Sequence, residues 1–233
     1  MEIKELVSSP LFGVTVTLVA YQLALYLNKA CRGTPLLHPV IVSMTALIII
    51  FTATGVTYED YFKGASYIHF MLGPATVALA VPLYENFEKV KRLLIPIIIA
   101  TLCGSATAVL SAVLLVKLFG GSLDTIISIA PKTVTTPIAM GVSEKIGGVP
   151  SLTAGMVLIT GAIGCVVAPV IYKIFNITDD GAKGLALGLS SHGFGTAQAF
   201  QISAVAGAFS GLALGLTGVV VAFLLPYLIR YIA

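Results

Sequence analysis

Apolar residues run along this chain in segments that are long enough to cross a lipid bilayer. The segments are 11–28, 37–55, 60–90, 93–118, 122–147, 150–175, 179–206 and 208–232, and the loops between them are short. Crossing the hydrocarbon core takes about 20 helical residues. The segments lack the alternation that is typical of barrel strands. The pattern predicts an all-α polytopic membrane protein with seven or eight hydrophobic elements in a single domain, residues 1–233.

Three of these segments contain helix breakers. Four segments are expected to be ordinary helices without breaks: 11–28, 93–118, 150–175 and 208–232. In 122–147, one helix is expected to end before Pro131, and a second one, capped by Thr135 or Thr136, is expected to begin at Pro137. The sequence therefore predicts a discontinuous helix in this segment.

Glycines interrupt the other two broken segments. In 179–206 the stretch HGFGT at 192–196 is too rich in glycine to continue a helix, and Thr196 can cap a restart at Ala197. In 60–90 the helix is expected to stop at Gly73 and to restart at Pro74. Broken helices leave backbone groups that lipid cannot satisfy, so the breaks are expected to line a cavity inside the protein.

An inverted repeat is expected from the spacing of these breaks. Lys63-Gly64 lies 120 residues before Lys183-Gly184, and Gly73 lies 120 residues before Gly193. Discontinuous helices in inverted repeats are typical of secondary transporters.

The lysines and arginines predict the orientation, because short cytoplasmic loops are enriched in them. If 122–147 enters the membrane and returns, Lys89, Lys173 and Arg230 fall on the same face as most other cations. If it crosses, Lys173 and Arg230 move to the opposite face. The re-entrant arrangement is favoured, with the N-terminus outside and the C-terminus in the cytoplasm.

Composition supports the membrane assignment and excludes several classes of protein. The chain is 58% hydrophobic and 10% charged, its mean hydropathy is +1.03, and its net charge of +3 is too small to suggest nucleic-acid binding. The three cysteines show no metal-binding spacing, and the first residues show no cleavable signal peptide. No motif of a hydrolase or a phosphate-binding enzyme is present. We therefore expect neither an enzyme nor a cofactor or metal site.

Lys132 is the residue that fits this apolar setting least well. A lysine near the membrane centre costs about 2.5–3.5 kcal/mol on insertion scales unless it finds a partner or water. It can supply positive charge to an anionic substrate, helped by the helix N-termini near Pro74, Pro137 and Ala197. Alternatively, it can pair with Asp124, Glu85 or a helix carbonyl and serve only the fold.

The remaining polar groups also have two interpretations. The threonines next to Lys132 are either helix caps or ligand hydroxyls. His192 is either a hydrogen-bonded packing residue or a proton carrier, and a proton or sodium ion is the expected coupling ion. The candidate substrate-binding residues are Lys132, Thr133, Thr135, Thr136, Pro137, Ser190, Ser191, His192, Gly193, Gly195, Thr196 and Gln198, with Pro74, Tyr84, Glu85 and Asn86 as a secondary set.

Several stretches give the whole chain a resemblance to a known family. They are APKTVTTPIAMGVSEKIGGVPSLTA and GLSSHGFGTAQA, together with HPVIVSM, YFKGA and VALAVPLYE. They resemble the LrgB family of bacterial membrane proteins, which includes CidB and is related to the carboxyl-terminal part of the plastid glycolate/glycerate transporter. Bacterial relatives were described as antiholin-like regulators of murein hydrolases that work with a small LrgA or CidA protein, and others are similar to pyruvate uptake systems.

The resemblance implies two alternative functions in the bacterial cytoplasmic (inner) membrane. One is transport of a small monocarboxylate such as glycolate, glycerate, pyruvate or lactate. The other is antiholin-like regulation of a holin-type pore and of murein hydrolase activity, with an LrgA/CidA-like partner. The expected partners are thus a carboxylate substrate, the lipid bilayer, this small membrane protein and a second copy of the chain. The buried lysine and the helix breaks favour transport.

Overall fold

The computed structural model describes residues 9–31, 34, 37–78 and 80–232, and every regular element in these ranges is a helix. The chain forms two compact units, Met1–Ala78 and Leu79–Ala233. The helices of unit 1 are α2 (Pro10–Ala30), α3 (Pro39–Thr54) and α4 (Tyr58–Ala78). The helices of unit 2 are α5 (Ala80–Glu85), α6 (Phe87–Arg92), α7 (Leu94–Leu118), α8 (Leu123–Ile129), α9 (Thr136–Ile146), α10 (Pro150–Ile174), α11 (Asp180–Ile202) and α12 (Ala204–Ile232).

Among the described residues, five helical stretches are long and apolar enough to cross a membrane. They are Pro10–Ala30, Tyr58–Glu85, Leu94–Leu118, Pro150–Ile174 and Ala204–Ile229. Large apolar side chains such as Leu114, Ile163 and Phe223 are exposed, whereas the hydroxyl groups of Thr101, Ser128 and many others are buried. This distribution suits a protein whose surroundings are lipid. The prediction of an all-α polytopic membrane protein is confirmed.

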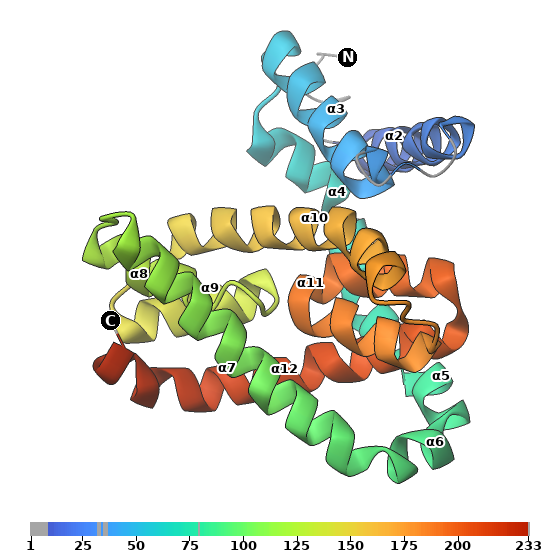
Figure 1. Ribbon diagram of the computed structural model, residues 1–233. Helices are drawn as coiled ribbons and strands as arrows, with labels where there is room; N and C mark the ends of the chain where they lie inside the picture. The colour runs from blue at the N-terminus through green and yellow to red at the C-terminus, as the bar shows by residue number, and fades with distance from the viewer. Residues whose placement is uncertain (1–8, 32–33, 35–36, 79, 233) are drawn as a thin grey trace. The chain divides into compact units, whose positions relative to one another are not determined.

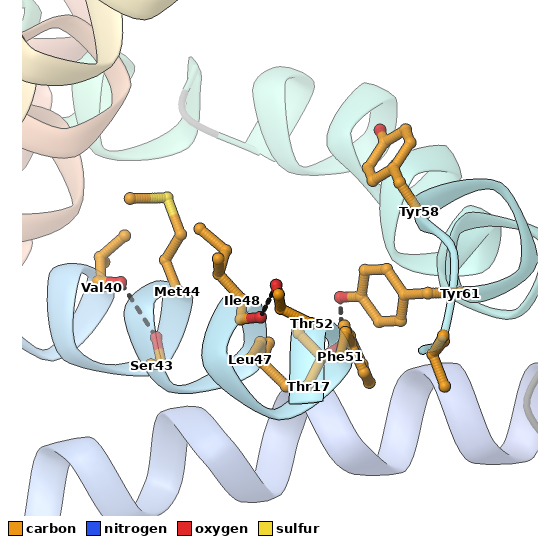
Figure 2. Close-up of a pocket in the computed structure, with 11 residues that line it drawn as sticks. Thr17, Val40, Ser43, Met44, Leu47, Ile48, Phe51, Thr52, Tyr58 and Tyr61 are labelled. Carbon is orange, nitrogen blue, oxygen red and sulfur yellow. Dashed lines mark hydrogen bonds between the residues drawn. The ribbon is translucent and has the colours of Figure 1, made fainter. Parts of the chain in front are cut away.

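In unit 1, α2 and α4 make a close contact at two glycines. A Cβ atom on Gly13 would collide with the backbone of Gly64, so larger residues cannot occupy this crossing. The hydroxyls of Thr17 and Tyr61 lie 2.7 Å apart and link the same two helices. An apolar groove of about 600 Å³, lined mainly by α3 and the start of α4, lies beside this link (Figure 2).

The break predicted at Gly73-Pro74 is not present. Helix α4 continues through Pro74 to Ala78. A proline inside a helix removes one backbone hydrogen bond and can bend the helix without ending it. The next interruption described is at Asn86, between α5 and α6.

The segment 122–147 enters unit 2 and turns back, as the distribution of charges predicts. Ser128 lies at the end of α8, yet its Oγ accepts a hydrogen bond of 2.9 Å from the backbone N–H of Val149, which follows α9. A continuous helix between these residues would separate them by roughly 30 Å. Helices α8 and α9 therefore form a hairpin, which we call the first hairpin (residues 123–146), with its tip at residues 130–135.

Three buried hydroxyl groups hold the base of the first hairpin on α10. The Thr153 hydroxyl lies 2.7 Å from the Ser143 hydroxyl and 2.9 Å from the carbonyl oxygen of Ser128. All three side chains are inaccessible to solvent. This cluster satisfies polar groups that lipid would leave unpaired.

Helix α11 also turns back, at His192. A Cβ atom on Gly195 would collide with the carbonyl oxygen of Leu187, although a straight helix separates residues eight positions apart by about 12 Å. The backbone of His192 has φ 42° and ψ −124°, which is not helical. We call residues 180–202 the second hairpin and residues 191–195 its tip.

This turn corrects the predicted topology of the C-terminal part. Gly184 and Gly188 on the first arm of the second hairpin contact the backbone of Ala206 and Ser210, so α12 begins beside the start of α11 and runs parallel to it. Residue Arg230, near the end of α12, therefore lies at the opposite end of unit 2 from the start of α11. The prediction that Arg230 shares a face with Lys89 and Lys173 is wrong, because α11 returns instead of crossing.

An inverted arrangement is present within unit 2, although at a different place from the one predicted. The first hairpin followed by α10 and the second hairpin followed by α12 are similar pairs that enter unit 2 from opposite ends (Figure 1). The predicted 120-residue repeat instead matched Gly73 to Gly193. That match fails at the structural level because α4 is continuous at Gly73.

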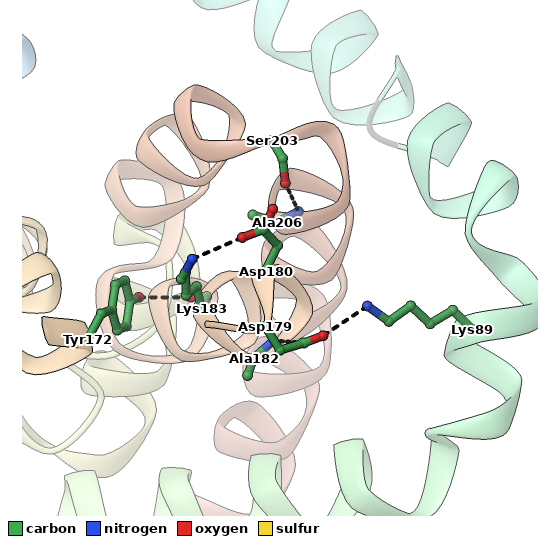
Figure 3. Close-up of polar contacts among 8 residues, drawn as sticks. All are labelled: Lys89, Tyr172, Asp179, Asp180, Ala182, Lys183, Ser203 and Ala206. Atoms are coloured by element: carbon green, nitrogen blue, oxygen red, sulfur yellow. Dashed lines mark hydrogen bonds and ion pairs between the residues drawn. The ribbon is translucent and has the colours of Figure 1, made fainter. Parts of the chain in front are cut away.

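A polar network fixes the base of the second hairpin (Figure 3). The Asp179 carboxylate caps α11 by accepting a 2.8 Å hydrogen bond from the backbone N–H of Ala182, and it forms a 3.2 Å ion pair with Lys89. The Ala182 bond and the Lys89 ammonium together hold the pKa of Asp179 below its ordinary value. Lys183 pairs with Asp180 at 3.0 Å. The Lys89–Asp179 ion pair joins α6 to the start of α11.

Candidate functional site

The two hairpin tips both reach the middle of α10. The buried apolar cluster that contains Val157 of α10 also contains Ala130 and Val134 of the first tip. The carbonyl oxygen of the same Val157 lies 3.1 Å from Nε2 of His192 in the second tip. Val157 therefore shares a buried cluster with the first tip and contacts the second tip, and we call the region around it the tip junction. The two breaks predicted at 131–137 and 192–196 belong to it.

Lys132 projects from the first tip onto α7. Its half-buried side chain donates a 3.0 Å hydrogen bond from Nζ to the carbonyl oxygen of Ala108. Among the residues that the structure describes, no carboxylate forms an ion pair with it, so neither Asp124 nor Glu85 neutralises it. The lysine is thus tethered by one neutral group and keeps its charge uncompensated.

The hydroxyl of Thr133, beside Lys132, has no hydrogen-bond partner within the described part of the chain. Its side chain is only 2% exposed. A buried polar group without a partner costs about 1–3 kcal/mol and needs an explanation such as a missing water or ligand. The first tip therefore contains a cation and an unused hydroxyl next to each other.

Helix α9 begins at this tip, one residue earlier than predicted. Thr135 occupies the N-cap position, Thr136 is the first helical residue and Pro137 follows it. The Thr135 side chain makes no capping hydrogen bond, and both threonines are half-buried. The free backbone N–H groups at the start of α9 carry partial positive charge. They add to the positive character of the tip.

His192 holds the second tip in a strained conformation. Its φ of 42° lies in a region that residues other than glycine rarely adopt and that costs about 1–3 kcal/mol. Its ring donates from Nε2 to the Val157 carbonyl, because a carbonyl oxygen can only accept. The ring also packs edge-on against Phe194, with 5.8 Å between the ring centroids. Gly193 is exposed and has no atom within 4 Å of where a Cβ would be.

The other predicted residues of the second tip are largely used by the fold. The Thr196 hydroxyl donates to the His192 carbonyl at 2.9 Å and lies 3.0 Å from the Ser210 hydroxyl of α12. Ser190 donates to the carbonyl of Ala186, and Gln198 donates from Nε2 to the carbonyl of Cys165. Gly195 is buried where the two arms of the hairpin meet. The Oε1 atom of Gln198 is buried without a partner in the described residues.

In the secondary set, Tyr84, Glu85 and Asn86 lie at the end of α5 and directly after it, outside the two tips. Pro74 lies within α4 of unit 1 and does not begin a helix. Tyr84 and Glu85 are exposed at the end of α5, and Asn86 donates to the nearby carbonyl of Pro82 at 2.8 Å. Helix α6 follows these residues and carries Lys89, which contacts the base of the second hairpin rather than its tip. An interface position explains Tyr84 and its neighbours better.

Several residues of the junction were not predicted. Gly161 and Gly164 of α10 face the second tip, where a Cβ on Gly161 would lie 2.8 Å from Cε1 of His192 and one on Gly164 would collide with the Ser191 hydroxyl. Glycine is enriched where membrane helices approach closely, although these two are three residues apart and do not form a GxxxG motif. Elsewhere in unit 2, the buried hydroxyls of Thr101, Ser105 and Thr217 are also unpartnered within the described chain. Each of these residues lies in a largely apolar helix, so the sequence did not single it out.

The first tip carries polar groups of a kind that suits a small anion. It combines a lysine, a helix N-terminus and an unpaired hydroxyl, which are the groups that recognise a carboxylate. In the part of the chain that is described, no group of three or more histidine, cysteine or acidic residues is placed to hold a metal ion. No step of covalent chemistry follows from this arrangement.

Comparisons with known proteins identify relatives along almost the whole chain. The LrgB-like family matches residues 17–231. The antiholin-like protein LrgB of Bacillus cereus is 34% identical over 96% of this chain and 97% of its own length. The holin-like protein CidB of Staphylococcus epidermidis is 33% identical over 93% of this chain and 94% of its own length. YwbG of Bacillus subtilis is 38% identical over 83% of this chain and 86% of its own length. No solved structure matches the chain.

Proposed function

This chain belongs to the LrgB-like family, and from that premise we propose that it is an antiholin-like regulator in the bacterial cytoplasmic membrane. In this role it controls a holin-type pore and murein hydrolase activity together with a small LrgA/CidA-like membrane protein. The observation that supports the proposal is the near full-length similarity to relatives named antiholin-like LrgB and holin-like CidB. The proposal involves no enzymatic step and no cofactor.

The lipid-facing surface of unit 2 suits a partner that is itself a membrane helix. Exposed leucine and isoleucine residues cover the outer faces of α7 and α10, for example Leu114 and Ile163. Lipid does not drive such surfaces together, so a partner must be held by packing and interhelical hydrogen bonds. Association is therefore expected to be reversible, which suits a regulator.

Expression in a Bacillus host without its own LrgB-type genes tests this function. Four strains express the small LrgA-like protein alone, this chain alone, both proteins, or neither. The measurements are propidium iodide uptake and murein hydrolase activity on zymograms. We expect the chain to change both quantities only when the small protein is present. Identical dye uptake and hydrolase activity with and without the chain would refute the regulatory function.

The tip junction supports a second candidate, a carrier for small monocarboxylates. The specific observation is Lys132, which is half-buried, bound to a carbonyl and not paired with a described carboxylate. We propose that its ammonium holds the carboxylate, and that Thr135, Thr136, Ser191 and the N–H groups near Pro137 and Thr196 supply hydrogen bonds. A proton or sodium gradient is the proposed driving force.

Counterflow in proteoliposomes tests this second candidate separately. Vesicles that contain only the purified chain are loaded with unlabelled pyruvate, glycolate, glycerate or lactate, and uptake of the labelled acid is followed under an imposed proton or sodium gradient. A carrier shows uptake above that of empty vesicles. If none of the four acids is taken up, with or without the small LrgA-like protein, the carrier hypothesis is wrong.

A further inference from the structure

The second tip docks on a bare strip of α10. Gly161 and Gly164 lie one turn apart and present backbone to His192 and Ser191, respectively. Above this strip, the His192 ring reaches the carbonyl of Val157 at 3.1 Å. Any side chain at Gly161 would approach the ring to 2.8 Å, so the glycine is required for docking. The tip is therefore held by one ring and two glycines.

The backbone of His192 is strained in the docked tip, and this strain works against docking. His192 adopts a positive φ, whereas the adjacent Gly193 does not, so the glycine stands beside the strained position and not at it. Strain of this kind persists only where surrounding contacts enforce it. Two contacts hold His192 here, the ring on the Val157 carbonyl and the Thr196 hydroxyl on the His192 carbonyl, and only the first one reaches α10. Once the ring leaves Val157, the tip can relax.

The outer side of the tip leaves room for movement. Gly193 is exposed and meets open space, and Phe194 is only half-buried. Behind the tip, Thr196 and Ser210 form a buried hydroxyl pair at 3.0 Å. Displacement of the tip from Val157 would expose this pair and separate the second tip from the cluster that contains Val134 of the first tip.

We propose that the tip of the second hairpin is a gate over the tip junction, and that His192 is its latch on α10. The closed state is the one observed, with the ring on the Val157 carbonyl and the backbone strained. The open state has a relaxed backbone and an accessible junction. The gate does not depend on whether the protein regulates a pore or carries a solute.

Hydrogen exchange measured by mass spectrometry on the full chain in lipid nanodiscs tests the gate. The variants are His192→Ala, which removes the ring and keeps the strain, and His192→Gly, which removes both. We expect the amides of 190–196 to exchange faster in His192→Ala than in His192→Gly, by roughly 5- to 150-fold, because only glycine relieves the strain. Equal exchange in these two variants would show that the His192 backbone is not strained, and exchange in His192→Ala as slow as in the unmodified protein would overturn the latch.

A second pair of variants does not change His192. Gly161→Ala displaces the ring, and Gly155→Ala, on the same helix but with no atom within 4 Å of its added methyl group, is the matched control. The gate predicts faster exchange at 190–196 in Gly161→Ala only, with α12 unchanged. Faster exchange of α12 to the same extent would mean that unit 2 opens as a whole, and the gate would then be wrong.

Discussion

Substitution of Lys132 by glutamine is the most informative single change, because it distinguishes a binding role of this lysine from a structural one. Glutamine is one bond shorter than lysine and uncharged, so its amide cannot reach the Nζ position 3.0 Å from the Ala108 carbonyl. That carbonyl lies inside α7 and keeps its helical hydrogen bond. The variant therefore leaves no buried acceptor unpaired.

Two opposing terms set the effect on stability. Loss of a charged hydrogen bond costs about 1.5–3 kcal/mol. Removal of a lysine from the membrane interior returns about 2.5–3.5 kcal/mol on insertion scales. The terms nearly cancel, and since 1 kcal/mol shifts the melting temperature of a chain of this size by about 2–4 °C, we expect a change within about 4 °C.

The effect on carboxylate affinity has no such compensation. A charge-assisted hydrogen bond to the ligand is worth about 1.5–3 kcal/mol, so Lys132→Gln should weaken binding by roughly 10- to 150-fold. Lys132→Arg should also lose most of the carboxylate binding, because the planar guanidinium group does not replace the point charge of the ammonium group. Lys145→Gln is the control, since Lys145 is an exposed residue at the far end of α9.

Calorimetric titration of the four carboxylates and thermal unfolding followed by circular dichroism are measured on the same purified samples. Weaker binding with an unchanged melting temperature supports the anion site. Unchanged affinity together with a melting temperature that falls by more than about 4 °C would show that Lys132 is only a tether. Failure of the unmodified protein to bind any of the four acids would refute the anion site altogether.

Three further predictions concern the architecture. Gly184→Ala and Gly188→Ala should prevent the second hairpin from packing on α12, because the new Cβ meets backbone oxygen atoms of Ala206 and Ser210. The yield of folded protein in size-exclusion chromatography should therefore fall sharply compared with the control Gly155→Ala. Asp179→Ala should lower the melting temperature by about 2–4 °C near neutral pH. Because the pKa of Asp179 is depressed in the folded protein, its contribution to stability exists above roughly pH 4 and disappears as the pH falls through the folded pKa. A difference in melting temperature that does not depend on pH would contradict this prediction. Cysteines introduced at Lys91 and Tyr231 should react with a membrane-impermeant maleimide from opposite sides of the membrane, and labelling from one side would contradict the return of α11.

Apolar length predicted the simple helices well. Segments 93–118 and 150–175 correspond to α7 and α10 within one residue at each end. Hydrocarbon thickness fixes such lengths, and no tertiary information is needed. The breaks at Pro131 and His192 were also found, because proline spacing, threonine caps and clustered glycines are local signals. Gly73-Pro74 shows the limit of these signals, since a membrane helix can continue through a proline, as α4 does.

The path of α11 could not be predicted because a break does not say whether the chain continues or returns. Counting cations placed Arg230 on the wrong face for this reason. The direction of the chain is instead indicated by pairs of small residues. Gly184 contacts Ala206 and Gly188 contacts Ser210, so both members of the pair move four residues forward, as in parallel helices. Such pairs are visible in the sequence only after the packing is known.

The forces that hold the tips explain why function is expected there. In lipid, burial of leucine does not drive helices together, and the junction relies on close contacts at glycine and on a few hydrogen bonds. The base of the first hairpin has a saturated hydroxyl cluster around Thr153, whereas its tip has an unpaired Thr133 and an unneutralised Lys132. The second hairpin is likewise capped firmly by Asp179 at its base and strained at His192. Both hairpins are thus anchored at their bases and least satisfied at their tips, so a ligand or a partner that completes the tips has the largest influence on the state of the protein.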